Sequence, residues 1–215
     1  MLTLPDTYAA LMARLQDQTI FGVVVDDSPM LRDLVRLGAE IAEKWAAVPT
    51  EAVRRIELLV LGNLAGTFTF NNVDLELGAE FPDSLPLPDR ERYVLCRRRT
   101  TDHAWLEYLA SNRYSAEAIP RLSTQLAARV GDCPIYMLTL AFILVSCGLC
   151  ERAVLVAKPP HAWLACWIKG DNSGEPRHLD LSVRSHGKRE EDMLDYYAQG
   201  FATALAKITI WPLEE

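Results

Sequence analysis

Apolar residues recur at three- and four-residue spacing near the start of the chain, a pattern that predicts two amphipathic helices. Ser28 and Pro29 have the residue types of a helix cap and a first helical residue. The apolar positions that follow them at helical spacing are Leu31, Leu34, Leu37, Ile41 and Trp45. A second helix is predicted from Thr50, and its inward-facing positions are Val53, Ile56 and Val60.

The pattern changes before residue 100. The segment TFTFNNVDLEL alternates as in a strand or an irregular hairpin, and FPDSLPLPDRER contains three prolines. Prolines at this density interrupt regular structure, so we expect a mainly helical region at residues 1–95 and a second region, the main core, at residues 96–215. The proline-rich segment is too short and too stiff to act as a flexible tether between two independent domains. The apolar faces of the predicted N-terminal helices must also be buried against another part of the protein. The first region is therefore expected to pack on the second and border its cleft.

The second half combines helices with strands, which predicts an α+β fold. TDHAWLEYLASN and IPRLSTQLAARV have the pattern of short helices, and a strongly apolar helix follows from Cys133 to about Cys147. Gly148 stands where helices favour a left-handed residue. The strand-like segments RAVLVAK, HAWLACWIK and RHLDLSV come next, and the turn-rich GDNSGEP separates the last two.

Charge and composition exclude several classes of partner. The net charge of −7 and the pI near 5.2 argue against binding to nucleic acid or to an anionic membrane. The longest apolar run is too short to span a bilayer, and the N-terminus lacks the pattern of a secretory signal, so we expect a cytoplasmic protein. The odd cysteine count disfavours a disulfide framework, and Cys96 and Cys166 are expected to be buried and inert.

Cys133 is the strongest candidate nucleophile. A thiol at the start of a helix meets unpaired backbone N–H groups and the positive end of the helix dipole, which favour the thiolate. His161 opens a later strand, and Asp180 lies in the strand-like segment after it. Neighbouring antiparallel strands could let the carboxylate orient the imidazole while the other ring nitrogen faces the sulfur. Asp171 is the next candidate for the carboxylate.

These residues carry a family resemblance. The run VGDCPIYMLTLAFILVSCGLCERAVLVAKPPHAWLACWI, followed by HLDLS, resembles the transglutaminase-like superfamily of papain-type thiol enzymes. The shared features are a Gly-x-Cys at the start of a long buried helix, a glycine closing that helix, a His-Ala-Trp on the next strand, and an Asp in the hydrophobic strand after it. The resemblance covers about residues 120–185. It implies a papain-like core, with the nucleophile helix packed on an antiparallel sheet, and a catalytic triad of Cys133, His161 and Asp180.

The resemblance also implies acyl transfer through a thioester. With water as the acceptor, which is the reaction we expect, the protein is a cysteine peptidase or amidase whose substrate is a peptide or protein amide. With an amine as the acceptor, it is a transglutaminase, and a binding protein that keeps the fold without turnover is the third alternative. No cofactor or metal is expected. His178 and His186 could be metal ligands, but ordinary surface positions in a strand and a loop account for these two histidines equally well.

His-Ala-Trp-Leu occurs twice, at His103 and at His161. His103 precedes Cys133 in a segment with a helical pattern, whereas the family order puts the histidine after the cysteine. His103 is therefore not expected to be catalytic. Trp105 and Gln125 are candidate oxyanion donors, because relatives use a tryptophan or a glutamine in that role; the alternatives are a core aromatic and an exposed helical residue. The backbone N–H of Cys133 is the preferred donor.

Two further pairs allow more than one interpretation. Trp163 and Trp167 share a face with His161, and they either line the substrate cleft or fill the core beneath the sheet. Cys147 and Cys150 form CGLC, which we interpret as packing at a helix end. A redox pair or a zinc site is less consistent with the sequence, because neither a thioredoxin-like βαβ context nor a second ligand pair accompanies it.

Overall fold

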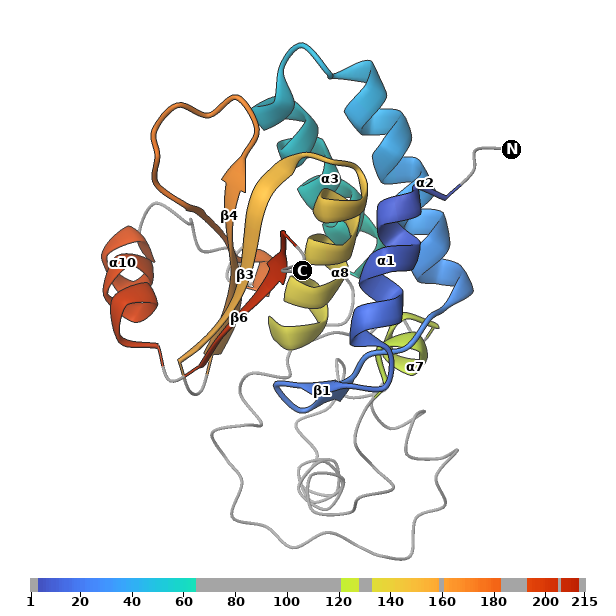
Figure 1. Cartoon of the computed structure of the whole chain (residues 1–215), viewed down its shortest axis with the longest axis horizontal. Helices are drawn as coiled ribbons and strands as arrows, with labels where there is room; N and C mark the ends of the chain where they lie inside the picture. Colours follow the sequence, from blue (N-terminus) through green and yellow to red (C-terminus); the bar gives the residue numbers. More distant parts are fainter. Residues whose placement is uncertain are drawn as a thin grey trace, which may run out of the picture.

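The computed structural model describes residues 4–64, 121–127, 133–158, 161–182, 193–204 and 206–212. These segments form an α+β fold with six α-helices, two antiparallel sheets and a helical N-terminal part (Figure 1). The predicted α+β class is confirmed at this level. None of the described helices combines the length and apolarity needed to cross a membrane.

The N-terminal part consists of helices interrupted by a short hairpin. Its elements are α1 (Asp6–Leu15), β1 (Thr19–Ile20), β2 (Val23–Val24), α2 (Pro29–Lys44) and α3 (Pro49–Leu64). Both predicted helices of this part are confirmed as α2 and α3. Neither α1 nor the hairpin was anticipated from the apolar pattern, because α1 is short and each strand has two residues.

The predicted cap of α2 is confirmed. Ser28 Oγ accepts a hydrogen bond from the Leu31 amide at 3.0 Å, and Pro29 lies in the first turn. Leu37, an expected member of the apolar stripe, is instead 43% exposed, because the buried stripe passes through Val35 and Gly38. In α3 the expected inward positions are all fully buried, namely Val53, Ile56 and Val60.

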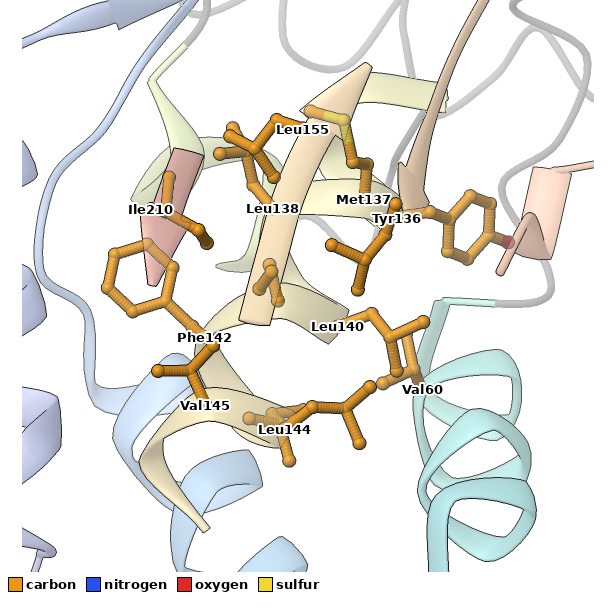
Figure 2. Close-up of a cluster of buried hydrophobic side chains, with 14 of the residues drawn as sticks. Val60, Tyr136, Met137, Leu138, Leu140, Phe142, Leu144, Val145, Leu155 and Ile210 are labelled. Atoms are coloured by element: carbon orange, nitrogen blue, oxygen red, sulfur yellow. The ribbon is translucent and has the colours of Figure 1, made fainter. Parts of the chain in front are cut away.

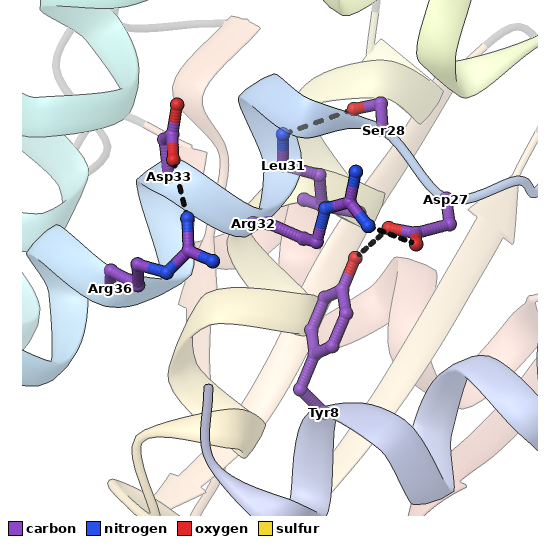
Figure 3. A network of polar contacts seen from close by, with 7 residues as sticks. All are labelled: Tyr8, Asp27, Ser28, Leu31, Arg32, Asp33 and Arg36. Carbon is purple, nitrogen blue, oxygen red and sulfur yellow. Dashed lines mark hydrogen bonds and ion pairs between the residues drawn. The ribbon is translucent and has the colours of Figure 1, made fainter. Parts of the chain in front are cut away.

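Polar contacts join α1 to the start of α2 (Figure 3). The Tyr8 hydroxyl donates to the Asp27 carboxylate, which also pairs with Arg32 at 3.2 Å. Burial, and then the hydrogen bond and charge of Asp27, raise the pKa of Tyr8, so the phenol remains a donor. One turn further along α2, Arg36 pairs with Asp33 at 2.7 Å.

The apolar helix α8 (Cys133–Ser146) lies at the centre of the fold, and all of its residues are buried. It packs against β3 and β4 on one side and against α1, α2 and α3 on the other. Figure 2 shows its side chains reaching Leu155 and Ile210 of the sheet and Val60 of α3. Gly148 has a left-handed φ of 66° and ends the helix, as predicted, with the Leu149 amide donating to the Leu144 carbonyl.

The main sheet has the order β5-β4-β3-β6, with all neighbours antiparallel. Its strands are β3 (Cys150–Lys158), β4 (His161–Ile168), β5 (Arg177–Leu179) and β6 (Ala206–Trp211). β3, β4 and β5 correspond to the predicted strand segments. β6 and the preceding helix, α10 (Leu194–Thr203), were not anticipated.

One correction concerns the end of β5. The expected strand RHLDLSV stops at Leu179, so Asp180 lies just beyond the strand, and Leu181 and Ser182 are helical. The Asp180 carboxylate accepts the Ser182 amide at 3.1 Å. Such local side-chain-to-backbone bonds compete with the ladder of a strand and so favour its termination.

Helices cover both faces of the sheet. The first face packs on α8 within the main core, which α1, α2, α3 and α7 (Leu122–Ala127) also share. The second face forms a smaller core with α10, and in Figure 1 the sheet lies between α10 and α8. The residues fully or nearly fully buried in this smaller core are Val154, Val156, Trp163, Ala165 and Tyr197.

Several sequence predictions fall outside the described residues. They are the strand or hairpin TFTFNNVDLEL, the proline-rich segment, the boundary near residue 95, and the individual residues Cys96, His103, Trp105 and His186.

Candidate active site

Cys133 is the first residue of α8, and its side chain is 4% exposed. Cα–Cβ bonds in a helix tilt toward the N-terminus, so the thiol leans past the start of the helix. The first backbone N–H groups of a helix lack partners within it. The thiol therefore lies at the positive end of the helix dipole, which favours the thiolate.

Chain direction brings the start of β4 to the same end of the fold. The chain reverses at Gly148 into β3 and reverses again before His161, where Lys158 pairs with His161 in the antiparallel register. Consequently α8 and β4 run in the same direction, and they pack against each other. Cys133 and His161 are the first residues of these two elements.

His161 and Asp180 form a buried hydrogen-bonded pair. His161 Nε2 contacts Asp180 Oδ2, and the two side chains are 12% and 1% exposed. An ionised carboxylate can only accept, so Nε2 carries the proton in this bond. The other ring nitrogen, Nδ1, is left for a second partner.

Three groups hold the Asp180 carboxylate in place. Oδ1 accepts from the Ser182 amide at 3.1 Å and from the Ser182 hydroxyl at 2.7 Å, and Oδ2 accepts from the Tyr197 hydroxyl at 2.9 Å. Burial raises the pKa of this carboxyl, but the hydrogen bonds and charge of His161, with those from Ser182 and Tyr197, outweigh burial and lower it below the ordinary value. Asp180 is therefore a fixed anion at neutral pH.

Aromatic rings from β4 and α10 enclose the imidazole. The centroid of the His161 ring is 6.0 Å from Trp163, in a stacked arrangement, and 6.3 Å from Tyr196. Tyr196 in turn lies 5.8 Å from Trp163, and Lys158 Nζ is 5.3 Å from the Tyr196 ring centroid. These contacts restrict the orientation of the imidazole on the α10 side.

The groups around Tyr196 also shift the pKa of its hydroxyl. Burial, followed by the negative charges of Asp180 and Cys133, raises the pKa of Tyr196. The phenol of Tyr196 therefore stays protonated at neutral pH. The shared direction of α8 and β4 puts Cys133 at the same end of the fold as His161.

Trp163 belongs to the smaller core between the sheet and α10. It is fully buried, and its indole N–H donates to His178 Nδ1 at 3.0 Å. Burial lowers the pKa of His178, although the charge of Glu175 opposes the shift, so the ring remains a neutral acceptor. Trp167 is partly buried at the far end of β4, where it donates to the Gly174 carbonyl.

Asp171 lies away from the His161–Asp180 pair, and Gln125 lies on α7. Asp171 is in the exposed turn after the end of β4, where it accepts the Ser173 amide at 3.0 Å, so it does not face the start of the strand. Gln125 is half-buried on α7, which packs against α2. The oxyanion role of Gln125 stays a prediction.

The remaining described cysteines lie in apolar surroundings. Cys166 is fully buried, and its hydrogen bond with Cys150 and its burial raise its pKa well above the ordinary value. Cys147 donates to the Val35 carbonyl at 3.7 Å, and burial raises the pKa of its thiol to about 12. Within the described segments no group of three or more His, Cys, Asp or Glu residues could hold a metal ion.

Sequence analysis missed three residues of this cluster: Ser182, Tyr196 and Tyr197. Ser182 was taken only as part of a strand. The segment MLDYYAQGF offered a signal, because adjacent tyrosines on a helix point in different directions and can contact two neighbours. The fold uses them in that way, with Tyr197 on Asp180 and Tyr196 beside His161.

No protein-family model matches this chain, and searches of the curated proteins and of the solved structures found no match either.

Proposed function

We propose that this protein is a cysteine hydrolase of the transglutaminase-like type, which cleaves an amide of a peptide or protein through a thioester on Cys133. The observation that carries the proposal is the buried His161–Asp180 pair. His161 is the first residue of β4, a strand that packs against α8 and runs in the same direction, and Cys133 is the first residue of α8. A thiol, an imidazole and a fixed carboxylate in this order form the constellation of nucleophile, base and orienting group.

In the first half of the reaction, His161 Nδ1 accepts the proton of the Cys133 thiol. The sulfur attacks the carbonyl carbon, and the carbonyl π electrons move to oxygen and give an oxyanion. We assign the backbone N–H of Cys133, at the start of α8, as a donor to that oxyanion. Asp180 stabilises the imidazolium through Nε2 and keeps the ring oriented.

In the second half, the oxyanion collapses and the C–N bond breaks. The imidazolium returns its proton to the leaving amine, which leaves a thioester on Cys133. Water then attacks the thioester with His161 as the base, and the products are a carboxylic acid and the free thiol. If an amine attacks in place of water, the same intermediate gives a new amide, which is the transglutaminase reaction.

Intact-mass analysis of a peptide library tests the proposal. The library is incubated with the full chain, with and without a primary amine. Cleavage that requires Cys133 supports the hydrolase, whereas amine incorporation supports the transglutaminase. If neither cleavage nor amine incorporation occurs at any protein concentration at which the chain is folded, the binding-protein alternative is favoured.

Matched variants separate catalysis from stability. Cys133→Ala and His161→Ala are expected to abolish turnover, because they remove the nucleophile and its base. Cys147→Ala is the control, since Cys147 is a packed thiol away from the His161–Asp180 pair. Turnover by Cys133→Ala at more than a small fraction of the wild-type rate would show that the nucleophile is another group.

A further inference from the structure

Tyr196, whose ring lies beside the His161 imidazole, has a hydroxyl for which the described residues provide no acceptor. Among the described residues, the Tyr197 hydroxyl is bound to Asp180, but no acceptor contacts the hydroxyl of Tyr196. Tyr196 is only partly buried, and its ring is held 6.3 Å from His161 and 5.8 Å from Trp163. A polar group in this position is both fixed and available to a bound molecule.

The Tyr196 hydroxyl also keeps its proton at neutral pH. Burial, and then the charges of Asp180 and Cys133, raise the pKa of the phenol above its ordinary value of 10.0. The hydroxyl of Tyr196, beside His161, is therefore a neutral donor and not a phenolate. A phenolate would repel both the thiolate and a developing oxyanion, whereas a phenol stabilises negative charge through a hydrogen bond.

We propose that Tyr196 is a further catalytic residue, whose hydroxyl donates a hydrogen bond to the oxyanion formed when Cys133 attacks the substrate carbonyl. The inference rests on the proposed function, and it adds a side-chain donor from α10 to the backbone donor at the start of α8. As the C–S bond forms, negative charge moves from sulfur to the carbonyl oxygen. The Tyr196 proton stays on the phenol throughout, and His161 alone carries the transferred proton.

The sheet and α10 position this donor rigidly. Gly200, one turn after Tyr196, lets α10 approach the sheet so closely that an added Cβ would lie 2.7 Å from the Trp163 ring. On the same helix, Tyr197 anchors the backbone to Asp180 through its 2.9 Å hydrogen bond. A donor held in advance needs little reorganisation when the oxyanion forms, which is the condition under which such donors lower the barrier most.

Two reactions of Cys133 distinguish this role from others. p-Nitrophenyl acetate acylates a thiol through an oxyanion, and release of p-nitrophenolate reports the rate. Iodoacetamide alkylates a thiolate by displacing iodide from carbon, and no oxyanion forms. Both rates are measured on the full chain, with the rates of Cys133→Ala subtracted as background.

Tyr196→Phe keeps the ring and removes only the hydroxyl. We expect acylation to slow by about 10²-fold, the usual cost of one oxyanion donor, while alkylation stays within about twofold of wild type. Tyr8→Phe, which loses a phenol hydroxyl far from Cys133 in the α1–α2 network, is the control and should leave both rates unchanged. Thermal unfolding of each variant verifies the fold.

Other outcomes would overturn the inference. Unchanged acylation by Tyr196→Phe would reduce Tyr196 to a packing residue. An equal loss of acylation and alkylation would mean that Tyr196 supports the thiolate and not the oxyanion. If the wild-type chain shows neither Cys133-dependent acylation nor alkylation faster than that of a free thiol, the proposed function fails together with this inference. This result is distinguishable from the two above, because it is seen in the wild type and not only in Tyr196→Phe.

Discussion

At the scale of single residues, Asp180 connects the chemistry of the site to its structure. Its carboxylate receives hydrogen bonds from β4, from the residues after β5 and from α10, through His161, Ser182 and Tyr197. Each of these donors favours the ionised form, and together they overcome the effect of burial on its pKa. A carboxylate fixed in this way keeps the proton of the imidazole on Nε2, so that Nδ1 can act as a base.

We predict that Asp180→Asn lowers turnover by about 10²- to 10⁴-fold, the range seen for triad carboxylates. An amide of the same shape keeps some of the hydrogen bonds but neither stabilises the imidazolium nor fixes the tautomer. Steady-state turnover of a Cys133-dependent substrate measures the effect, and Asp171→Asn is the control. Full activity of Asp180→Asn would exclude Asp180 from the reaction.

A second prediction concerns His178, which accepts the Trp163 indole N–H in its neutral form. Burial lowers its pKa below the ordinary 6.5, so the unfolded chain takes up a proton first as the pH falls. The contribution of neutral His178 to stability is complete above about pH 6.5 and is lost as the pH falls through the lower folded-state pKa. The free energy of unfolding should therefore decrease with falling pH over this window.

His178→Gln supplies the comparison, because glutamine keeps an acceptor but does not titrate in this range. Urea unfolding at several pH values from 7.5 downward should show a smaller decrease for His178→Gln than for the wild type. Parallel curves for the two proteins would show that His178 does not lose its hydrogen bond on protonation. The difference between the curves removes the contribution of the other titrating groups.

At the scale of elements, apolar spacing predicted α2, α3 and α8, and strand-like runs predicted β3, β4 and β5. These elements are long or strongly patterned, and local signals such as Ser28 and Gly148 mark their ends. The contact of His161 with Asp180 followed from the expected pairing of neighbouring strands. The β1–β2 hairpin, α10 and β6 were missed, because their positions depend on the partners they pack against.

A helix contact gives a prediction at this scale. In α2, a Cβ added to Gly38 would lie 2.4 Å from Ile143 Cγ2 and 3.3 Å from Cys147 Sγ of the α8 region. Alanine is about 1 kcal/mol better than glycine within a helix, but overpacking a rigid core costs about 1–3 kcal/mol. Gly38→Ala should therefore lower the free energy of unfolding, despite its better helix propensity.

Gly62→Ala is the matched control. Gly62 is an exposed position in α3, where an added Cβ meets nothing within 4 Å, so the substitution should stabilise the chain by up to about 1 kcal/mol. Chemical unfolding of both variants gives the comparison. A stabilised Gly38→Ala would mean that α2 can move away from α8 at little cost.

At the scale of the whole molecule, the N-terminal helices and the sheet share one core through α8. Residues of α1, α2 and α3 belong to the same buried cluster as residues of β3 and β4. Individual contacts show how the N-terminal helices pack on α8. The ring centroids of Tyr8 and Phe142 are 6.0 Å apart, and Gly38 lies against Ile143. The apolar faces of the N-terminal helices predicted that these helices pack against another part of the protein. The sequence did not identify α8 as the element on which they pack.

We therefore predict that a fragment of residues 96–215 does not fold alone, because removal of α1, α2 and α3 exposes the face of α8 that they bury. The fragment should aggregate or lack a cooperative thermal transition. The control is the full chain with a protease site engineered between residues 81 and 92, in which the two cleaved halves should stay associated and keep a thermal transition close to that of the uncut chain. A soluble fragment that melts cooperatively and reacts at Cys133 as fast as the full chain would show instead that the sheet and α8 form an independent unit, and that the N-terminal helices only border it.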